Sequence, residues 1–232
     1  MTARTRRTVI ARQAGRLMLR TVLQPLMNPM QEARRTQFAA LTAPRGRIVM
    51  LGDSITELGM WSEWFPEAPM ANRGIGGERS GDILARLHTA IDRPRAVFLL
   101  IGTNDLAVAI PEQEIVANVR AIVDTITRLS PGIPVYVQSV MPRGLKFRDE
   151  VRSLNERYRE IVDAAGEHVH YLDLWPALET PDGALNPDMT NDTLHLNGTG
   201  YRAWADVLKP LINGIQKAHA ETAVLAQNGA GR

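Results

Sequence analysis

The stretch RIVMLGDSITELG, Arg47 to Gly59, combines an apolar run with an abrupt polar end. The residues up to Leu51 have the pattern of a buried β-strand, and Gly52, Asp53 and Ser54 then interrupt it. Two interpretations fit this pattern. The strand ends either in an ordinary capped turn or in a turn that carries a serine nucleophile at the edge of a sheet. The rest of the chain decides between them.

Apolar runs and helical patterns alternate along the chain after this stretch. Their order predicts a three-layer α/β/α domain, doubly wound around a five-stranded parallel sheet. In such sheets the ligand binds beyond the carboxyl ends of the strands. The expected strands cover residues 47–51, 69–75, 95–102, 133–140 and 168–174. The expected helices cover 80–91, with Ser80 as its cap, 111–129, 149–166 and 198–212.

Three parts follow from this organisation: a basic helical arm over 1–43, the α/β domain over 44–213 and a polar tail over 214–232. Apolar and arginine positions over 9–24 predict an amphipathic helix that ends at Pro25. A second short helix is expected to begin at Asn28-Pro29, with asparagine as the cap.

Composition narrows the range of functions. The 232 residues include no cysteine, which excludes disulfides and thiolate metal sites. No apolar run approaches the roughly 18 residues of a membrane span. The arm holds eight arginines and one acidic residue, while the remainder has an acidic excess, so no nucleic-acid-binding domain is indicated.

The charged arm leaves the location open. We expect a cytoplasmic protein. The alternatives are peripheral membrane contact through residues 9–24, or export, since TRRTVI faintly resembles a twin-arginine signal. Arg12, Arg16 and Arg20 interrupt what would be the apolar part of such a signal, and no small-residue cleavage site follows.

Three loops at the carboxyl ends of the first three expected strands carry chemically useful groups. Ser54 follows the first strand, the glycine-rich segment 72–80 follows the second, and GTND, Gly102 to Asp105, follows the third. A hydroxyl, a backbone turn and the Asn104 carboxamide are the groups that acyl transfer needs, namely a nucleophile and donors for an oxyanion.

A serine nucleophile also needs a base with an orienting partner. Of the five histidines, only His195 lies in a long polar loop before a helix, and Asp192 precedes it by three residues. A tight turn at this spacing lets the carboxylate bind one imidazole nitrogen and leaves the other for the serine. Asp192 and His195 are therefore the candidate partners of Ser54.

These segments, GDSIT, NRGIGG, GTND and DTLHLN, match in order the blocks of the SGNH (GDSL-type) hydrolases over about residues 46–213. The chain resembles the branch of sialate O-acetylesterase-like proteins and platelet-activating-factor acetylhydrolase relatives. The resemblance implies a flavodoxin-like SGNH hydrolase fold, no metal or other cofactor, and a Ser54–His195–Asp192 triad. It also implies an oxyanion hole formed by the Ser54 and Gly77 N–H groups, with Gly76 as the alternative glycine, and by the Asn104 side chain.

The sequence departs from that branch at Thr193, where the branch usually has glycine. Because a β-branched residue adopts positive φ with difficulty, we expect the turn before His195 to differ.

Other residues near the expected site have two interpretations each. Asp53 and Asp105 either bind a metal or, as we favour, brace their loops by accepting backbone hydrogen bonds. Arg143 either contacts a substrate anion or is a solvated loop charge. Three aromatic residues after the nucleophile either line a substrate pocket or pack in the core, namely Trp61, Trp64 and Phe65.

The sequence therefore predicts a serine esterase for small acyl groups, acetyl above all, with a small-molecule ester as its substrate. By resemblance alone, an O-acetylated carbohydrate is the favoured ester. A lipid-directed esterase or lysophospholipase, with the arm on the membrane, is one alternative. A non-catalytic binding module on the same fold is the other.

Overall fold

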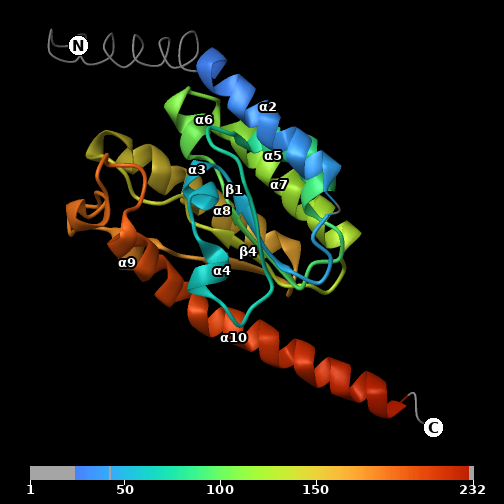
Figure 1. The fold of residues 1–232 in the computed structure, drawn as a ribbon. Coiled ribbons are helices and arrows are strands. Elements are labelled where there is room, and N and C mark those ends of the chain that lie inside the picture. Colours follow the sequence, from blue (N-terminus) through green and yellow to red (C-terminus); the bar gives the residue numbers. More distant parts are fainter. Residues whose placement is uncertain (1–23, 42, 230–232) are drawn as a thin grey trace, which may run out of the picture.

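The protein is described by a computed structural model over residues 24–41 and 43–229. The helix predicted over 9–24 lies outside these residues except for Gln24. The described part contains a five-stranded sheet flanked by helices (Figure 1).

The sheet is parallel throughout, in the order β2-β1-β3-β4-β5. Gly52 at the end of β1 lies in register with Gly74 of β2 and Leu100 of β3, so these three strands end at the same level. The strands are β1 (Ile48–Gly52), β2 (Met70–Gly74), β3 (Ala96–Leu100), β4 (Val135–Gln138) and β5 (Val169–Leu172). The predicted fold class and strand order along the chain are confirmed.

Helices connect the strands and extend the chain at both ends. The α-helices are α2 (Gln24–Ala40), α3 (Ser54–Glu57), α4 (Trp61–Trp64), α5 (Ser80–Ala90), α6 (Thr103–Ala107), α7 (Glu112–Leu129), α8 (Arg148–Ala165), α9 (Trp175–Leu178) and α10 (Gly198–Gly229). Two 3₁₀ helices lie in the loops, η2 (Leu145–Phe147) and η3 (Pro187–Met189).

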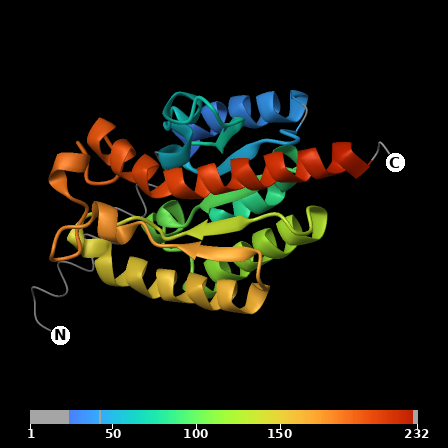
Figure 2. The same ribbon diagram turned by 90° about the horizontal axis from the view of Figure 1, so that it is seen from below.

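Two apolar clusters cover the two faces of the sheet. Alternate side chains of β1 and β3, among them Val49 and Leu99, pack with the apolar faces of α5, α7 and α8. The intervening side chains, among them Met50 and Phe98, pack with α4, α9 and α10. Figure 2 shows the strands between α8 and the long red helix α10. Burial on both faces explains why the central strands are continuous apolar runs.

The helix at the carboxyl end is longer than predicted. We expected it to end at residue 212, but α10 continues to Gly229, and Figure 1 shows its last turns projecting past the body. The residues after 214 are rich in helix-forming Ala, Gln, Lys and Glu, which favour helix without tertiary packing.

The prediction of a helix boundary between Pro25 and Asn28 is wrong, because α2 passes through both Pro25 and Pro29. A proline near the start of a helix removes few hydrogen bonds. Packing against the body also stabilises α2, since Phe38 is buried and its ring lies under the guanidinium of Arg73. Ser80 is likewise not a cap. Arg79 holds that place, and the Ser80 hydroxyl donates to Asp105 at 2.6 Å.

Candidate active site

The segment after β1 places Ser54 at the start of a helix at the carboxyl edge of the sheet. A Cβ on Gly52 would lie 2.2 Å from Thr56 Oγ1 and 2.4 Å from the Leu100 carbonyl oxygen, so only glycine fits there. The Asp53 carboxylate accepts the Ile55 N–H at 3.0 Å and caps α3. The abrupt halt of the apolar run is therefore a strand–turn–helix junction with Ser54 at its apex.

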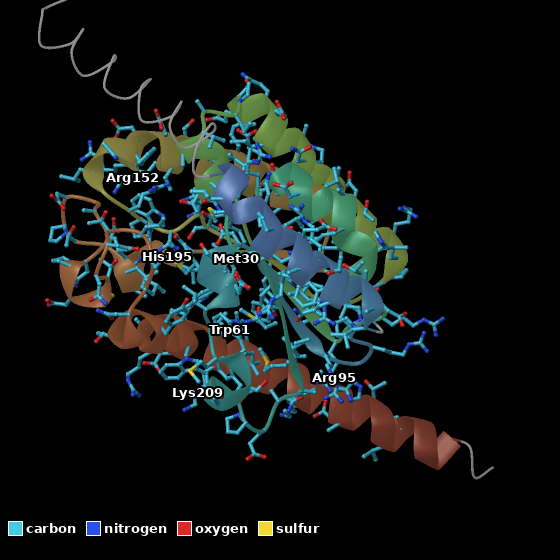
Figure 3. The ribbon with its side chains drawn as sticks, turned by 45° about the horizontal axis from the view of Figure 1, so that its top comes forward. Met30, Trp61, Arg95, Arg152, His195 and Lys209 are labelled. Carbon is cyan, nitrogen blue, oxygen red and sulfur yellow. The ribbon has the colours of Figure 1, made fainter. Side chains whose placement is uncertain are left out.

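Residues 141 positions apart meet at this junction. Ser54 Oγ lies 3.0 Å from His195 Nε2, and His195 Nδ1 lies 2.6 Å from Asp192 Oδ2. Because a carboxylate only accepts, Nδ1 carries the proton and Nε2 is left to accept from the serine hydroxyl. Figure 3 shows His195 in the orange loop that precedes α10.

A tight turn holds the acid and the imidazole together. Asp192 Oδ1 accepts the N–H groups of Leu194 at 2.9 Å and of His195 at 2.7 Å. The Thr190 hydroxyl donates to the His195 carbonyl oxygen at 2.7 Å. Partial burial raises the pKa of Asp192, but the hydrogen bonds from His195 and Leu194 outweigh it and lower that pKa to about 2. Asp192 therefore stays ionised over the whole range in which the imidazole can act as a base.

The expectation of a different turn at Thr193 is not met. Thr193 adopts φ of 66°, the left-handed conformation that favours glycine. Such a conformation costs a non-glycine residue roughly 1–2 kcal/mol, and the hydrogen bonds around Asp192 offset it. The departure from glycine thus changes the strain of the turn and leaves Asp192 within reach of His195.

Three candidate N–H donors belong to residues that follow β1, β2 and β3, namely Ser54, Gly77 and Asn104. The described residues provide no acceptor for the Ser54 N–H or the Gly77 N–H. The Asn104 amide donates one hydrogen to the Glu78 carbonyl oxygen at 2.9 Å, which leaves its second hydrogen available. The Gly76 N–H, in contrast, donates to Glu57 Oε2 at 2.7 Å. This arrangement favours Gly77 over Gly76 as the glycine of an oxyanion site.

The two acids beside the site brace their loops, as predicted. Asp53 caps α3, and Asp105 accepts the Ser80 N–H at 3.1 Å as well as the Ser80 hydroxyl. Burial raises the pKa of Asp53 to about 7, against the lowering effect of the Ile55 N–H. Within residues 24–41 and 43–229, no group of three or more His, Asp or Glu side chains could hold a metal ion.

Of the two interpretations of the aromatic residues after Ser54, the structure supports core packing for Trp61 and Phe65. Both are core residues, with exposed fractions of 1% and 7%, and Trp61 packs edge-on against Trp204. Trp64 is half-buried beneath the Arg202 guanidinium. The Trp61 indole N–H donates to the Thr56 carbonyl oxygen at 2.9 Å, so this core residue holds α3 in place.

Arg143 is not a solvated loop charge. Its guanidinium donates to the Thr103 carbonyl oxygen at 3.0 Å and to the Thr103 hydroxyl at 2.9 Å, next to Asn104. It also lies 3.9 Å from the centre of the Phe147 ring. Burial lowers its pKa to about 10, while Asp53, Glu150 and Asp192 raise it. Contact with a substrate anion stays a prediction.

The sequence analysis missed the contribution of α2. Gln31, Arg34 and Arg35 on this helix bind the glycine turn and its neighbours, and a groove of about 410 Å³ runs between α2 and α3, with Glu57 and Gly76 in its wall. Glu57 follows Ser54 by one helical turn, so its closeness to the nucleophile could have been inferred from the sequence. The arm offered no motif that pointed to these contacts.

A five-stranded parallel α/β fold with a hydrogen-bonded serine, imidazole and carboxylate at the carboxyl edge has the architecture and the side chains of a serine hydrolase. Comparison with known proteins gives the family. Residues 50–203 match the model of the GDSL-like Lipase/Acylhydrolase family, and the chain belongs to that family. It is an acylhydrolase of the SGNH/GDSL type, a carboxylic ester hydrolase.

Named relatives fit this assignment. Platelet-activating factor acetylhydrolase IB subunit alpha1 of Rattus norvegicus is 30% identical over 175 residues, which cover 71% of this chain and 74% of the relative. The solved structure of a GDSL-like lipase from Bacteroides thetaiotaomicron has a TM-score of 0.67 at 26% identity and covers 79% of this chain and 97% of that chain.

A more distant structure shares the fold. A carbohydrate esterase of family 3 from Talaromyces cellulolyticus has a TM-score of 0.62 at 19% identity and covers 74% of this chain and 99% of that chain.

Among the described helices, none is both long and apolar enough to cross a membrane.

Proposed function

We propose that this acylhydrolase is a serine esterase for short-chain esters, acetyl esters first, with Ser54 as nucleophile, His195 as base and Asp192 as its orienting acid. One observation carries the proposal. Ser54, His195 and Asp192 form a hydrogen-bonded chain with contacts of 3.0 Å and 2.6 Å at the carboxyl edge of the sheet, where the described residues provide no acceptor for the Ser54 and Gly77 N–H groups. These are the groups that acyl transfer requires, in reach of one another.

The reaction proceeds through an acyl-enzyme. Ser54 Oγ attacks the ester carbonyl carbon while His195 Nε2 takes its proton, and the imidazolium then gives that proton to the leaving alcohol. Water, activated in the same way, attacks the acyl-serine and releases the acid. The ionised Asp192 stabilises the imidazolium in both steps.

Negative charge develops on the carbonyl oxygen in each tetrahedral intermediate. The Ser54 N–H, the Gly77 N–H and the remaining Asn104 amide hydrogen bind this oxyanion. Donors fixed before the reaction stabilise such a charge without reorganising, and loss of one donor costs roughly 10²- to 10³-fold in kcat. The chemistry needs no metal, and Asp53 and Asp105 serve the loops instead.

The choice of acyl group and alcohol rests on likeness. The 30% identical relative is named an acetylhydrolase, which supports an acetyl group. The sequence blocks resemble the sialate O-acetylesterase-like branch, which supports an O-acetylated carbohydrate as the ester.

A panel of esters tests this proposal. Full-length wild type and Ser54→Ala would be assayed on p-nitrophenyl esters from acetate to decanoate and on O-acetylated sugars. We expect kcat/KM to be highest for acetate and to fall by about 10³-fold or more in Ser54→Ala. A preference for long chains would contradict the acetyl proposal, and normal turnover by Ser54→Ala would exclude Ser54 as the nucleophile.

A non-catalytic binding module is disfavoured, because every group that the chemistry needs is present. Labelling with a fluorophosphonate probe at neutral pH tests this point. An unlabelled wild-type protein would restore the binding-module alternative.

A lipid ester is the second candidate, and one observation favours it. Large apolar side chains near the site are exposed, with exposed fractions of 69% for Leu26, 77% for Met30 and 60% for Met60. Leu26 and Met30 lie on α2, which forms one wall of the groove beside Ser54, and Figure 3 shows Met30 on this helix. Six arginines of the basic arm, between Arg4 and Arg20, precede α2 in the sequence and would add attraction to anionic lipid.

Co-sedimentation with vesicles of phosphatidylcholine and phosphatidylserine tests the lipid candidate. The variant Leu26→Gln/Met30→Gln should lose binding if α2 faces a bilayer. Leu129→Gln is the matched control, since Leu129 is an exposed apolar residue at the end of α7. Equal binding of all three proteins would remove α2 from any membrane role.

A further inference from the structure

Helix α2 binds the glycine turn that follows β2. The Gln31 side chain, 3% exposed, donates through Nε2 to the Gly76 carbonyl oxygen at 2.8 Å. Arg34 pairs with Glu57 at 3.1 Å, and Arg35 pairs with the buried Glu78 at 2.9 Å. The arm therefore contacts the turn and the residues on either side of it.

The contact at Gly76 has a consequence for the next N–H. The Gly76 carbonyl and the Gly77 N–H belong to one planar trans peptide, so they point in opposite directions. A donor that holds the carbonyl oxygen thereby fixes the direction of the Gly77 N–H. We propose that Gln31 is a positioning residue that aims the Gly77 N–H at the oxyanion formed on the ester, and this inference rests on the proposed function.

This peptide needs such a restraint, because both residues that flank it are glycines. Glycine rotates between positive and negative φ at little cost, so a Gly–Gly peptide can turn over more easily than any other. Gly77 has φ of 74°. In the reversed orientation the Gly76 carbonyl oxygen would face the oxyanion and repel it. The bond from Gln31 Nε2 to the Gly76 carbonyl oxygen exists only in the observed orientation, because the reversed peptide would present its N–H to Gln31 and would require the carboxamide to turn over and accept through Oε1.

The backbone conformation, with φ of 74°, favours glycine at residue 77. A Cβ on Gly77 would lie 2.4 Å from Met27 Cε and 2.8 Å from Gln31 Nε2, so it would push aside the ends of these two side chains of α2. Helix α2 thus lies against the turn at the residue whose N–H is proposed to bind the oxyanion.

Glu57 restrains the peptide that precedes Gly76. Its carboxylate accepts the Gly76 N–H at 2.7 Å, so this N–H is not available to a substrate. A carboxylate one turn from the nucleophile would oppose negative charge on the substrate, and Arg34 of the same helix α2 partly neutralises it. Gln31 and Glu57 together restrain both peptides of Gly76.

The test compares full-length wild type with Gln31→Met and Gln31→Glu. Methionine keeps most of the volume and removes the donor, and glutamate keeps the shape and replaces the donor with an acceptor. Gln113→Met is the matched control, since Gln113 is exposed on α7, away from the turn. Steady-state hydrolysis of p-nitrophenyl acetate gives kcat and KM, and thermal unfolding gives Tm.

A trifluoromethyl ketone forms a stable tetrahedral adduct, so its inhibition constant reports on the oxyanion site in variants that keep Ser54 and His195. Ser54 Oγ adds to its carbonyl carbon, the serine proton goes to His195, and the carbonyl electron pair becomes an alkoxide in the oxyanion site. We expect kcat to fall about 10- to 100-fold in Gln31→Met and further in Gln31→Glu, with KM changed less than about threefold. The inhibition constant should rise by the same factor as kcat falls.

Other results would overturn the inference. If wild type turns over acetate and both variants match Gln113→Met, Gln31 does not position the donor. If KM rises at constant kcat, α2 acts on substrate binding instead. If neither variant folds, the contact serves the fold. An inactive wild type that no fluorophosphonate labels would instead reject the proposed function on which the inference rests.

Discussion

The two ends of the parallel sheet differ in chemistry more than in shape. At the amino ends of the strands, a cavity of about 470 Å³ is lined by Arg93, Pro134, Ile215 and His219 among others. At the carboxyl ends, the groove between α2 and α3 is somewhat smaller, at about 410 Å³. Both ends therefore offer space and a histidine.

What separates them is the number of polar groups that converge. His219 is exposed on α10, while His195 binds both Ser54 and Asp192. Helices α3 and α6 begin directly after β1 and β3 at the carboxyl edge, so the N–H groups of their first turns lie at that edge. At the amino edge the chain enters the strands from the carboxyl ends of helices, which present carbonyl groups and not N–H groups. Cavity size alone would have selected the wrong end.

Replacing one histidine at each end should produce the largest difference. We expect His195→Ala to lower kcat/KM for p-nitrophenyl acetate by about 10³-fold or more, because His195 is the side chain hydrogen-bonded to Ser54 Oγ among the described residues. His219→Ala should stay within about twofold of wild type. Similar losses in both variants would show that the two ends are coupled, and the comparison would fail.

Replacing one asparagine in each region should produce a smaller difference in kcat. Asn104→Ala should lower kcat by about 10²- to 10³-fold with little change in KM, since its donor matters most when the oxyanion forms. Asn213→Ala, an exposed asparagine on α10, should leave kcat unchanged. Stopped-flow or steady-state rates on the same ester decide the point. A rise in KM alone would assign Asn104 to ground-state binding.

The buried acid at the carboxyl edge predicts a stability that depends on pH. The pKa of Asp53 is raised from 3.8 to about 7, so between these values the folded protein holds a proton that the unfolded chain has lost. Stability should therefore fall as pH rises from about 4 to about 7. We expect the Tm of wild type to drop relative to Asp53→Asn by about 5 °C or more between pH 5 and pH 8.

Asp124→Asn, at an exposed residue of α7, is the control for this series. It should follow wild type at every pH. A constant difference in Tm between wild type and Asp53→Asn across the range would show that Asp53 ionises normally.

The smallest expected effect concerns the strained turn. Thr193→Gly should raise the free energy of unfolding by up to about 1 kcal/mol, because glycine adopts the positive φ of 66° without steric cost but loses more backbone entropy. Urea unfolding measures the change. The rate on p-nitrophenyl acetate should stay within about twofold, since Asp192 and His195 keep their contacts. A tenfold loss of rate would show that the threonine side chain itself matters.

Sequence patterns predicted the strands well, because β1 and β3 are buried on both faces and consist almost entirely of apolar residues. The meeting of Ser54 and His195 followed from topology, since parallel strands bring their carboxyl-end loops to one edge. The core burial of Trp61 was not predictable, because an aromatic residue near a nucleophile fits a pocket as well as a core. Only its packing on Trp204 of α10 distinguishes the two.

The arm was the part that sequence described least accurately. Pro25 and Pro29 suggested helix ends, yet α2 runs through both because its buried face packs on the body. The contact between Gln31 and Gly76 spans 45 residues and joins a side chain to a carbonyl. No periodicity or motif encodes such a bond, so only the three-dimensional arrangement reveals it.

Helix α2 also bears on where the enzyme begins. The family model starts at residue 50, ten residues after α2 ends. A fragment trimmed to that boundary would retain the serine, the histidine and the aspartate, and it would lack the side chain that closes on the Gly76 carbonyl. Residue 50 also lies inside β1, so a fragment that begins there would lose the buried Ile48 and Val49 of this central strand although it keeps every sequence motif.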